Sequence, residues 1–247
     1  MSIHHRDILL IIMAMASRAK QIIRGIAPHG AVVLYRNYKS KPRNLNFCPI
    51  CETESRFANA GGDETKPRPQ ARCPNCRSLE RHRLLWLFIV KKIGLENIAK
   101  AKKMLHFAAE PSFKKKFRPL LGKKYITADL YAPADAKVDI TDIQFKDNSF
   151  SVIISSHVLE HIVDDAKAIK ELHRVLAPGG HAILLVPQTN KATTYEDFSI
   201  KTKAGRLKAF DQADHVRKYG ADFQQRLVKA GYKVKLYRAQ TWPAPKT

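Results

Sequence analysis

The sequence is poor in glycine and in long apolar runs. It has 11 glycines in 247 residues, and none between Gly94 and Gly122, where an expected buried strand at Met104–Ala108 runs into a turn. This excludes from that turn the glycine-rich loop whose backbone usually approaches a bound nucleotide. The longest apolar run near the N-terminus, Ile8–Ala16, is far shorter than the roughly 20 residues of a membrane-spanning helix.

Acidic residues are also scarce: 22 Asp and Glu stand against 44 Lys and Arg, a net charge of +22. Such a charge attracts polyanions such as RNA, or an anionic membrane surface, and says little about the fold. The excess is concentrated in residues 1–46 and in Lys66–Lys124, whereas Asp129–Asp165 is rich in aspartate. We therefore expect the basic and acidic parts to have different tasks.

The N-terminal residues 1–46 are interpreted as a basic helical segment. Ile8–Ile26 is expected to form an amphipathic helix that covers the protein body or rests on anionic lipid. The flanks of the apolar run faintly resemble a signal peptide, but the cysteine usage favours a reducing compartment. We expect a cytoplasmic protein without a transmembrane helix, with peripheral contact to an anionic membrane as an open alternative.

Only four cysteines occur, in two Cys-x-x-Cys pairs: Cys48 with Cys51, and Cys73 with Cys76. The 21 residues between the pairs are close to the spacing of a zinc ribbon, and each pair can present two sulfurs to one ion. We expect a structural Zn²⁺ site in a ribbon-like module at residues 47–80. Two disulfides or four free thiols are the alternatives. Four thiolates leave the ion no open position, so any chemistry must lie elsewhere.

After a connecting helix at residues 81–101, strand-like and helical segments alternate. This alternation predicts a doubly wound, mostly parallel Rossmann-like α/β sheet over residues 102–247. The expected strands are Met104–Ala108, Tyr125–Ala128, Val152–Ser155, Ala182–Val186 and Tyr232–Tyr237, and the expected helices are Phe113–Leu120, Asp164–Leu176 and Ala221–Ala230. Because the chain ends soon after the last strand, a further strand at the sheet edge is expected to be truncated or missing.

Acidic residues follow two of the expected strands. Asp129 ends the second strand, about 20 residues beyond the first turn, where an acid can accept both hydroxyls of an adenosine ribose. Asp139 and Ile140 lie just before the next long strand, near the expected place of an adenine ring. Each acid taken alone could be a solvated loop residue. Together, in this order at strand ends, they favour a nucleotide site.

The segment from Leu105 to Pro187 resembles the class I S-adenosylmethionine-dependent methyltransferases of the type-11 group, most specifically in DNSFSVIISSHVLEHIVDDAKAIKELHRVLAPGGHAILLVP. The stretches CPNCRSLERHRLLW, TTYEDFSI and DHVRKYG resemble a narrower bacterial subgroup, whose members often accompany surface-glycan biosynthesis. The resemblance implies S-adenosylmethionine as cofactor. It also implies that Asp129 holds the ribose hydroxyls, that Asp139 accepts from the adenine amino group, and that the Ile140 backbone pairs with a ring nitrogen.

The first loop departs from this family, because HFAAEP stands where acid-x-Gly-x-Gly is usual. Ala108 is small enough for close approach, although alanine does not readily take a positive φ. Glu110 is expected to replace the usual loop acid and to reach the cofactor's amino group. The residues expected at the cofactor are Phe107, Ala108, Glu110, Asp129, Leu130, Asp139, Ile140 and Ser156.

His157, which directly follows the fourth strand of the family pattern, is the candidate for a base or for a contact with the acceptor. A histidine that hydrogen-bonds its own loop is the alternative. Glu160 and His161, one turn later, are expected to be structural. The residues expected at the acceptor are Tyr195, His215, Arg217 and Tyr219, with a salt-bridged surface loop as the alternative.

Three functions remain open from the sequence. The first is methylation of a hydroxyl oxygen on a small molecule or glycan. The second is RNA methylation, which the charge and the zinc ribbon suit, although the basic segments carry few interleaved aromatic residues for base stacking. The third is a non-catalytic zinc-ribbon protein whose α/β domain has lost its cofactor.

Overall fold

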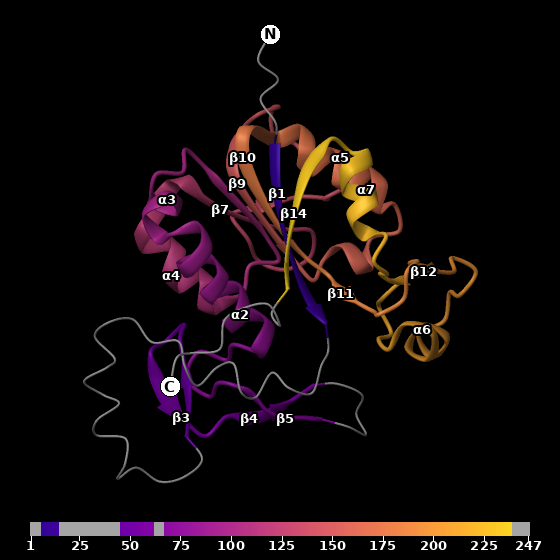
Figure 1. Cartoon of the computed structure of the whole chain (residues 1–247), viewed down its shortest axis with the longest axis horizontal. Coiled ribbons are helices and arrows are strands. Elements are labelled where there is room, and N and C mark those ends of the chain that lie inside the picture. Colours follow the sequence, from indigo (N-terminus) through magenta and orange to yellow (C-terminus); the bar gives the residue numbers. More distant parts are fainter. Residues whose placement is uncertain (1–5, 15–44, 62–66, 239–247) are drawn as a thin grey trace. The chain divides into compact units, whose positions relative to one another are not determined.

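The computed structural model describes residues 6–14, 45–61 and 67–238 (Figure 1). They divide into two compact units, one formed by residues 6–14 and 95–238 and the other by residues 45–61 and 67–94. Each unit is described by itself. No helix of the described residues is both long and apolar enough to cross a membrane.

The larger unit contains a parallel sheet with β6 (Met104–Phe107) and β9 (Phe150–Ser156) side by side near its centre. β7 (Tyr125–Asp129) and β8 (Ala136–Lys137) extend it beyond β6, and β10 (Leu176–Leu185) extends it beyond β9. The chain thus runs outward from β6 to β8 and returns to β9, so the winding reverses between β6 and β9. Parallel α/β sheets bind their ligands at the carboxyl ends of the strands at such a point. The expected doubly wound fold is confirmed.

The N-terminal run forms β1 (Arg6–Ala14), so the helix expected over Ile8–Ile26 is wrong for its first part. The rest of that segment, and most of the expected basic segment 1–46, lies outside the described residues. β1 pairs in parallel with β10 on one side and with β14 (Tyr232–Arg238) on the other, and its end pairs with β11 (Pro187–Gln188). A short, uninterrupted apolar run fits an inner strand of a parallel sheet as well as it fits a helix, and periodicity alone does not separate the two.

The same strand changes the expectation for the sheet edge. The sequence predicted a further strand that is truncated or missing after Tyr232–Tyr237. In the structure β1 lies between β10 and β14, so the sheet continues from β10 through β1 to β14. The extra strand comes from the beginning of the chain, where the alternation of strands and helices gave no reason to look for it.

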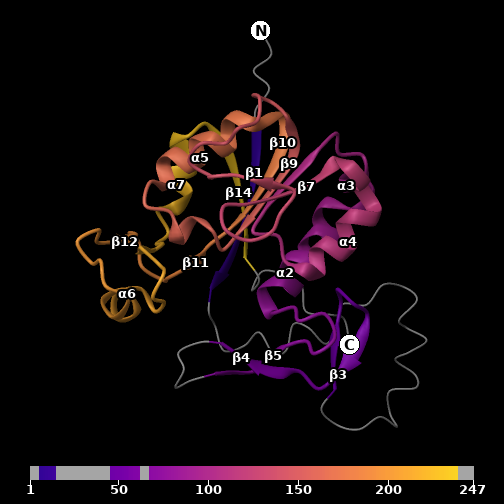
Figure 2. The same ribbon diagram turned by 180° about the vertical axis from the view of Figure 1, so that it is seen from behind.

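Helices cover both faces of this sheet. α3 (Leu95–Ala99) and α4 (Pro111–Leu121) lie on one side, and α5 (Asp165–Val175) and α7 (Phe223–Lys229) on the other (Figures 1 and 2). The three predicted helices agree with α4, α5 and α7 to within two residues at each end. The main core joins the buried faces of the central strands to α5 and α7.

An excursion of the chain lies between β11 and α7. It contains α6 (Lys203–Phe210) and a short antiparallel pair, β12 (Tyr195–Glu196) with β13 (Arg217–Lys218). The sequence predicted neither α6 nor this pair: strands of two residues leave no periodic pattern, and α6 has only eight residues, of which Phe210 alone is buried. The excursion brings residues 195–219 toward the segment that follows β9, as the hydrogen bond from the Val216 amide to the Glu160 carbonyl shows.

The smaller unit contains two antiparallel hairpins and a helix. β2 (Asn46–Cys48) pairs with β3 (Thr53–Ser55), and β4 (Ala58–Ala60) pairs with β5 (Arg68–Arg72). The connecting helix expected at residues 81–101 is shorter in the structure: α2 (Glu80–Phe88) continues as a π-helical turn, η4 (Ile89–Ile93), and ends at Gly94, whose φ is +86°. The Arg83 guanidinium is buried and donates to the carbonyls of Ser78 and Ala71 at 2.8 and 3.0 Å, so it ties α2 to the hairpins.

Candidate functional site

The turn after β6 shows how the chain manages without glycine. Ala108 has a φ of +48°, the left-handed region that glycine usually supplies, and its amide donates to the Ala128 carbonyl at 2.9 Å. This conformation costs a non-glycine residue about 1 kcal/mol. Glu110 then precedes α4, whose first residue is Pro111, with a φ suited to a helix start. Ala108 thus takes the positive φ that the sequence argument considered difficult for alanine, at this cost.

The Glu110 side chain faces a buried histidine. Its Oε2 lies 3.4 Å from Nε2 of His106, and Nδ1 of His106 lies 2.9 Å from the hydroxyl of Tyr125. Burial raises the pKa of Tyr125 well above its usual value, and the negative charge of Glu110 acts in the same direction. In this conformation Glu110 braces the turn against β6, so the contact expected with the cofactor's amino group stays a prediction.

Asp129 ends β7 with its carboxylate held by the backbone that follows. Its Oδ1 accepts from the amides of Tyr131 and Ala132 at 2.8 and 2.7 Å. Within the described part of the chain, Oδ2 has no hydrogen-bond partner. The carboxylate is therefore oriented through one oxygen while the other stays open to a ligand, which suits the ribose role expected for Asp129.

An arginine fixes the loop beyond Asp129. Arg118 donates to both carboxylate oxygens of Asp135, and Asp135 accepts from the amide and the hydroxyl of Thr127. Burial alone would raise the pKa of Asp135, but the hydrogen bonds from Thr127 and Arg118 outweigh it and hold that pKa below its usual value. α4, β7 and the loop after Asp129 are thereby joined.

A second arginine fixes the loop that carries Asp139 and Ile140. Arg174 on α5 donates to the carbonyls of Ile143 and Phe145 and pairs with Glu171, whose other bond is to the Ile143 amide. The hydrogen bonds from Arg174 lower the pKa of Glu171 below its usual 4.5. The loop is thus held before any ligand arrives.

Asp139 uses one oxygen locally. Its Oδ1 accepts from the amide and the hydroxyl of Thr141, both at 2.8 Å, and the residue is exposed. The side chains of Ile140 and Phe107 are buried in the core, so only their backbones can reach a ligand, as the sequence predicted for Ile140. Leu130 is half-buried beside Asp129.

The carboxyl end of β9 carries polar groups that the described protein leaves unpaired. Ser155 and Ser156 are buried, and neither hydroxyl oxygen has a hydrogen-bond partner in residues 45–61 and 67–238. A buried hydroxyl without a partner is destabilising. These two groups therefore point to a ligand or an ordered water at this end of the sheet, where Ser156 was expected.

His157 follows Ser156 directly, has an unusual backbone conformation and contacts a carboxylate. Its φ is +56°, its amide donates to the Leu185 carbonyl at 2.9 Å, and its Nδ1 lies 3.1 Å from Oε1 of Glu160. A non-glycine residue at positive φ is uncommon and often belongs to a functional site. Nε2 has no hydrogen-bond partner among the described residues, so it is the nitrogen available to a substrate.

Two further histidines lie close to Glu160. Glu160, His161 and His215 each offer an atom within 4.8 Å of the others, and the rings of His161 and His215 meet edge to face at 4.7 Å. Burial lowers the pKa of His215, and the charge of Glu160 does not overcome that effect. The sequence placed Glu160 and His161 in a structural role and missed this cluster. The adjacent Glu160 and His161 in His-Val-Leu-Glu-His were the available signal, and His215 joins them only through the fold.

Arg217 and Tyr219 are turned into the protein. The guanidinium donates to Glu196 Oε2 at 2.8 Å, to the carbonyls of Leu159 and Val163 at 3.1 and 2.8 Å, and to the carbonyl of Ile162. The Tyr219 hydroxyl donates to Asp165 at 2.7 Å. Both side chains are fully buried. The substrate-binding role expected for these two residues is therefore not supported, because their polar groups hold the segment after β9.

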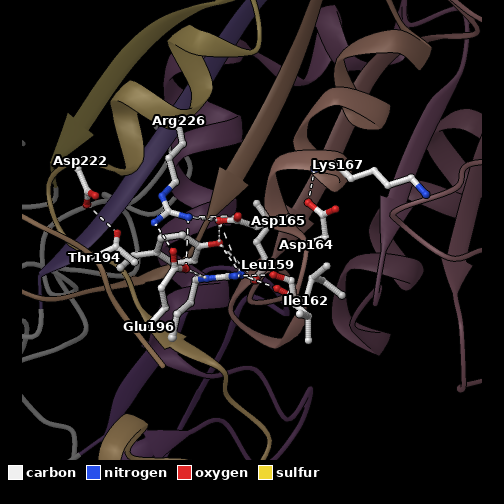
Figure 3. Close-up of polar contacts among 12 residues, drawn as sticks. Leu159, Ile162, Asp164, Asp165, Lys167, Thr194, Glu196, Asp222 and Arg226 are labelled. Atoms are coloured by element: carbon white, nitrogen blue, oxygen red, sulfur yellow. Dashed lines mark hydrogen bonds and ion pairs between the residues drawn. The ribbon is translucent and has the colours of Figure 1, made fainter. Parts of the chain in front are cut away.

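The same network joins the excursion to α5 and α7. Figure 3 shows Arg226 pointing at both Asp165 and Glu196, and Thr194 bonded to Asp222. Burial would lower the pKa of Arg226, but the hydrogen bonds and charges of Glu196 and Asp165 raise it. By contrast Tyr195 is half exposed and packs on Phe210 at 5.6 Å between ring centroids. Of the expected acceptor residues, Tyr195 is the accessible one, and the buried His215 lies in the histidine cluster.

The four cysteines converge in the smaller unit. Their sulfurs all lie within 4.8 Å of one another, with Cys48 and Cys76 at 3.6 Å and Cys51 and Cys73 at 3.7 Å, and none forms a disulfide. With Zn–S bonds of about 2.3 Å, a tetrahedron places its sulfurs about 3.8 Å apart. The Ser78 hydroxyl lies 3.4 and 3.1 Å from the sulfurs of Cys48 and Cys76. The distances thus fit one tetrahedral ion and do not fit the two-disulfide alternative.

Residues 101–184 match the family model described as a methyltransferase domain. This confirms, for about a third of the chain, the expected resemblance to the type-11 methyltransferases. The matched segment contains Asp129, Asp139, Ser156 and the His157–Glu160 pair, whereas the cysteines and the excursion after β11 lie outside it.

Curated proteins that resemble part of this chain are named as methyltransferases. The chain is 33% identical over 79 residues to the ubiquinone/menaquinone biosynthesis C-methyltransferase of Hydrogenovibrio crunogenus, covering 30% of this chain and 31% of the relative. It is 34% identical over 87 residues to the protein of that name from Idiomarina loihiensis, covering 33% of each. The chain therefore spans about a third of the length of these curated relatives.

Solved structures include a methyltransferase from Bacillus halodurans, at 23% identity and a TM-score of 0.40, covering 56% of this chain and 64% of that one. An S-adenosylmethionine-dependent methyltransferase from Mesorhizobium loti has 16% identity and a TM-score of 0.36, covering 52% of this chain and 73% of that one.

Proposed function

We propose that this chain transfers a methyl group from S-adenosylmethionine to a hydroxyl oxygen of a small-molecule or glycan acceptor. The observation that carries the proposal is the arrangement at the carboxyl ends of β7 and β9. Asp129 presents one open carboxylate oxygen after β7, and the His157–Glu160 pair follows β9 directly. Both lie within the segment that matches a methyltransferase domain.

The residues present fit the cofactor. Ala108 already has the positive φ needed at the first turn, Asp129 keeps an oxygen open, and the Ser156 hydroxyl is buried without a partner in the described protein. When bound, S-adenosylmethionine supplies a methyl group on a positively charged sulfur. Asp129 would hold the ribose hydroxyls, with the adenine between Asp139, Ile140 and Leu130. Phe107, Ala108 and Ser156 would line the methionine side, with Glu110 bracing the turn.

The acceptor proton would go to His157. The Glu160 carboxyl group beside Nδ1 would orient the ring and favour a proton on that nitrogen, which leaves the lone pair of Nε2 to accept the proton of a hydroxyl. The same carboxylate stabilises the imidazolium that forms, as in other carboxylate–histidine pairs. The positive φ of His157 and the bond from its amide to Leu185 limit how far the ring can move.

The accessible part of the excursion would form the acceptor wall. Tyr195, Phe198 and Leu207 are exposed and apolar or aromatic, and they belong to the segment that the Arg217 and Arg226 contacts fasten beside β9. Such a surface suits the carbon face of a sugar or another partly apolar acceptor. His215 completes the polar side of the same segment.

The four thiolates would hold a structural Zn²⁺ in the smaller unit. Their spacing fits a tetrahedral ion and leaves no position for a substrate. The zinc would thus stabilise this unit without taking part in methyl transfer.

RNA is the second candidate acceptor, and the net charge of +22 is what favours it. The two candidates differ in their response to salt. Methylation of an RNA held by its phosphates should weaken steeply as salt increases, whereas methylation of a neutral sugar or phenolic acceptor should change little.

The proposal is tested by following a radiolabelled methyl group from S-adenosylmethionine into separate pools of sugar, phenolic and RNA acceptors. We expect label in an acid-stable ether of a sugar or phenol. His157→Gln should lower the rate by about 10²–10⁴-fold, and the control His181→Gln, on β10, should leave it unchanged. Label in RNA would move the assignment to the second candidate, and an unchanged rate in His157→Gln would remove the base assignment.

A further inference from the structure

Three side chains near the carboxyl end of β9 form a second group of metal-ligand type. Glu160 and His161 come from the short helix η6 (Leu159–His161), and His215 comes from the excursion. Their ligand atoms all lie within 4.8 Å of one another. Nothing in the base role of His157 requires His161 or His215, so the cluster needs its own explanation.

Glu160 is the first reason to look for a cation here. Its side chain is fully buried, and neither carboxylate oxygen has a hydrogen-bond partner within the described residues. Oε1 faces Nδ1 of His157, while Oε2 has no such neighbour. A buried carboxylate is costly unless a cation or several hydrogen bonds compensate it, and the contact with His157 serves Oε1 alone, so Oε2 is the oxygen left for an ion. Arg217, the buried cation nearby in the network, is engaged with carbonyl oxygens and with other carboxylates.

The surroundings of His161 are the second reason. Its Nδ1 lies 3.3 Å from the carbonyl oxygen of Asp214 and 3.4 Å from that residue's carboxylate. Histidines that bind a metal usually donate their other ring nitrogen in this way, to a carbonyl or a carboxylate, and so fix the ring for the ion. With Nδ1 engaged in this way, Nε2 of His161 would be the nitrogen that binds the ion.

The backbone holds the two contributing segments together. The Val216 amide donates to the Glu160 carbonyl at 2.9 Å, and Arg217 bonds to the carbonyls of Leu159 and Ile162 on either side of the pair. A third of the His161 side chain is exposed, so the cluster is reached from solvent. The ligands are thus preset by the fold and have an entry path.

We propose that Glu160, His161 and His215 bind a divalent transition-metal ion such as Zn²⁺, with an open position for an oxygen of the acceptor or for water. Two imidazoles and one carboxylate are the ligand set of open, catalytic zinc sites, and imidazole suits Zn²⁺, Ni²⁺ and Fe²⁺ better than Mg²⁺ or Ca²⁺. The ion would compensate Glu160 and place an acceptor oxygen beside Nε2 of His157. The acceptor role rests on the proposed function, whereas ion binding does not.

The test uses Co²⁺ as a probe on the whole chain after a single equivalent of Zn²⁺ has been added, so that the four-thiolate site is filled and the second site is left empty. Cobalt bound by thiolates shows intense charge-transfer absorption in the near ultraviolet, and cobalt bound by imidazole and carboxylate does not. We expect one equivalent of Co²⁺ to bind with weak visible bands only. His161→Asn and His215→Asn should each weaken this binding at least tenfold, and the control His181→Gln should not change it.

Two results would overturn the proposal. One is a folded, zinc-loaded protein that takes up no further Co²⁺ at millimolar concentration. The other is uptake that persists in both His161→Asn and His215→Asn. Circular dichroism of each variant separates loss of the site from loss of the fold. Calorimetry with S-adenosylhomocysteine on the same protein tests the proposed methyl transfer separately. Co²⁺ uptake can fail while S-adenosylhomocysteine binds, and the reverse is equally possible.

Discussion

The cysteine group and the histidine–glutamate group differ in what they leave open. The four sulfurs of the smaller unit face one another at the distances of a filled tetrahedron, with Cys48 and Cys73 fully buried. Glu160, His161 and His215 offer only three ligands, and about a third of the His161 side chain is exposed to solvent. A closed set of four soft ligands suits a structural ion, and an incomplete set of nitrogen and oxygen ligands suits chemistry.

The same contrast separates the two sides of the sheet's carboxyl edge. On the cofactor side, Arg118 and Arg174 satisfy the carboxylates that shape the loops after β7 and β8. At the end of β9, by contrast, Ser155, Ser156, His157 and Glu160 keep buried polar atoms without partners in the described chain. The loops after β7 and β8 are therefore fixed by their own ion pairs, whereas the end of β9 leaves buried polar groups for a ligand.

The largest effect on stability is expected at the four cysteines. Cys73→Ser removes a buried thiolate, and because structural zinc contributes about 10 kcal/mol to small metal-dependent folds, residues 45–94 should lose both metal and structure. Zinc content and limited proteolysis measure the change, with Ser78→Ala as a control that spares all four sulfurs. A Cys73→Ser protein that keeps one zinc and its protease resistance would show that the group is not a structural metal site.

The next largest effect is expected at Arg217, which holds the segment that carries Glu160 and His161. Arg217→Lys keeps the charge but loses the planar set of donors that bonds to Glu196 and to the carbonyls of Leu159, Ile162 and Val163. We expect a loss of about 3 kcal/mol in the free energy of unfolding, measured by urea denaturation. Arg206→Lys, with one bond to the Ile200 carbonyl, is the control and should lose less than about 1 kcal/mol. Equal losses in both variants would contradict the scaffold role.

A smaller effect tests the preset cofactor side through pH. The folded-state pKa of Glu171 is lowered by Arg174 below 4.5, so its stabilising contribution is present above about pH 4.5 and disappears as pH falls through the lowered value. Glu171→Gln should lose about 1–2 kcal/mol of stability at pH 7, and the difference from wild type should shrink at pH 3. Glu96→Gln is the exposed control. If the stability difference between wild type and Glu171→Gln grew at low pH, the lowered pKa of Glu171 would be contradicted.

The smallest effect is expected at the turn after β6. Ala108→Gly removes the cost of a positive φ, so its free energy of unfolding should exceed that of Ala109→Gly by about 1 kcal/mol. Ala109→Gly is the matched control, since it frees the unfolded chain without relieving a positive φ, and it should bring no gain. Thermal denaturation of both variants decides the point, and a less stable Ala108→Gly protein would show that the alanine methyl group is needed.

The alternation of strands and helices was enough to predict the sheet, because five strands and three helices carry clear periodic patterns. β1 was missed because nine apolar residues fit either a helix or an inner strand, and its partners β10 and β14 lie more than 160 residues away in sequence. Such long-range pairing leaves no local signal.

Of the candidate site, residues that follow strand ends were predictable, and partners brought in by tertiary structure were not. Asp129, Ser156 and His157 follow from the positions of their strands. Arg217 was expected to hold a substrate. Its burial could not be foreseen, because it depends on Glu196 and on backbone carbonyls near residue 160, which only the folded excursion brings together. The pairing of His215 with Glu160 has the same origin.

The most direct test of the central claim is calorimetric binding of S-adenosylhomocysteine to the purified, zinc-loaded protein, with Asp129→Ala beside it. Glu96→Ala, which removes an exposed acid from the helix before β6, is the control. The account predicts micromolar binding by wild type and Glu96→Ala, and at least a tenfold loss in Asp129→Ala. No binding by a folded, metal-loaded wild type, or equal binding by Asp129→Ala, would contradict a methyltransferase site at this end of the sheet.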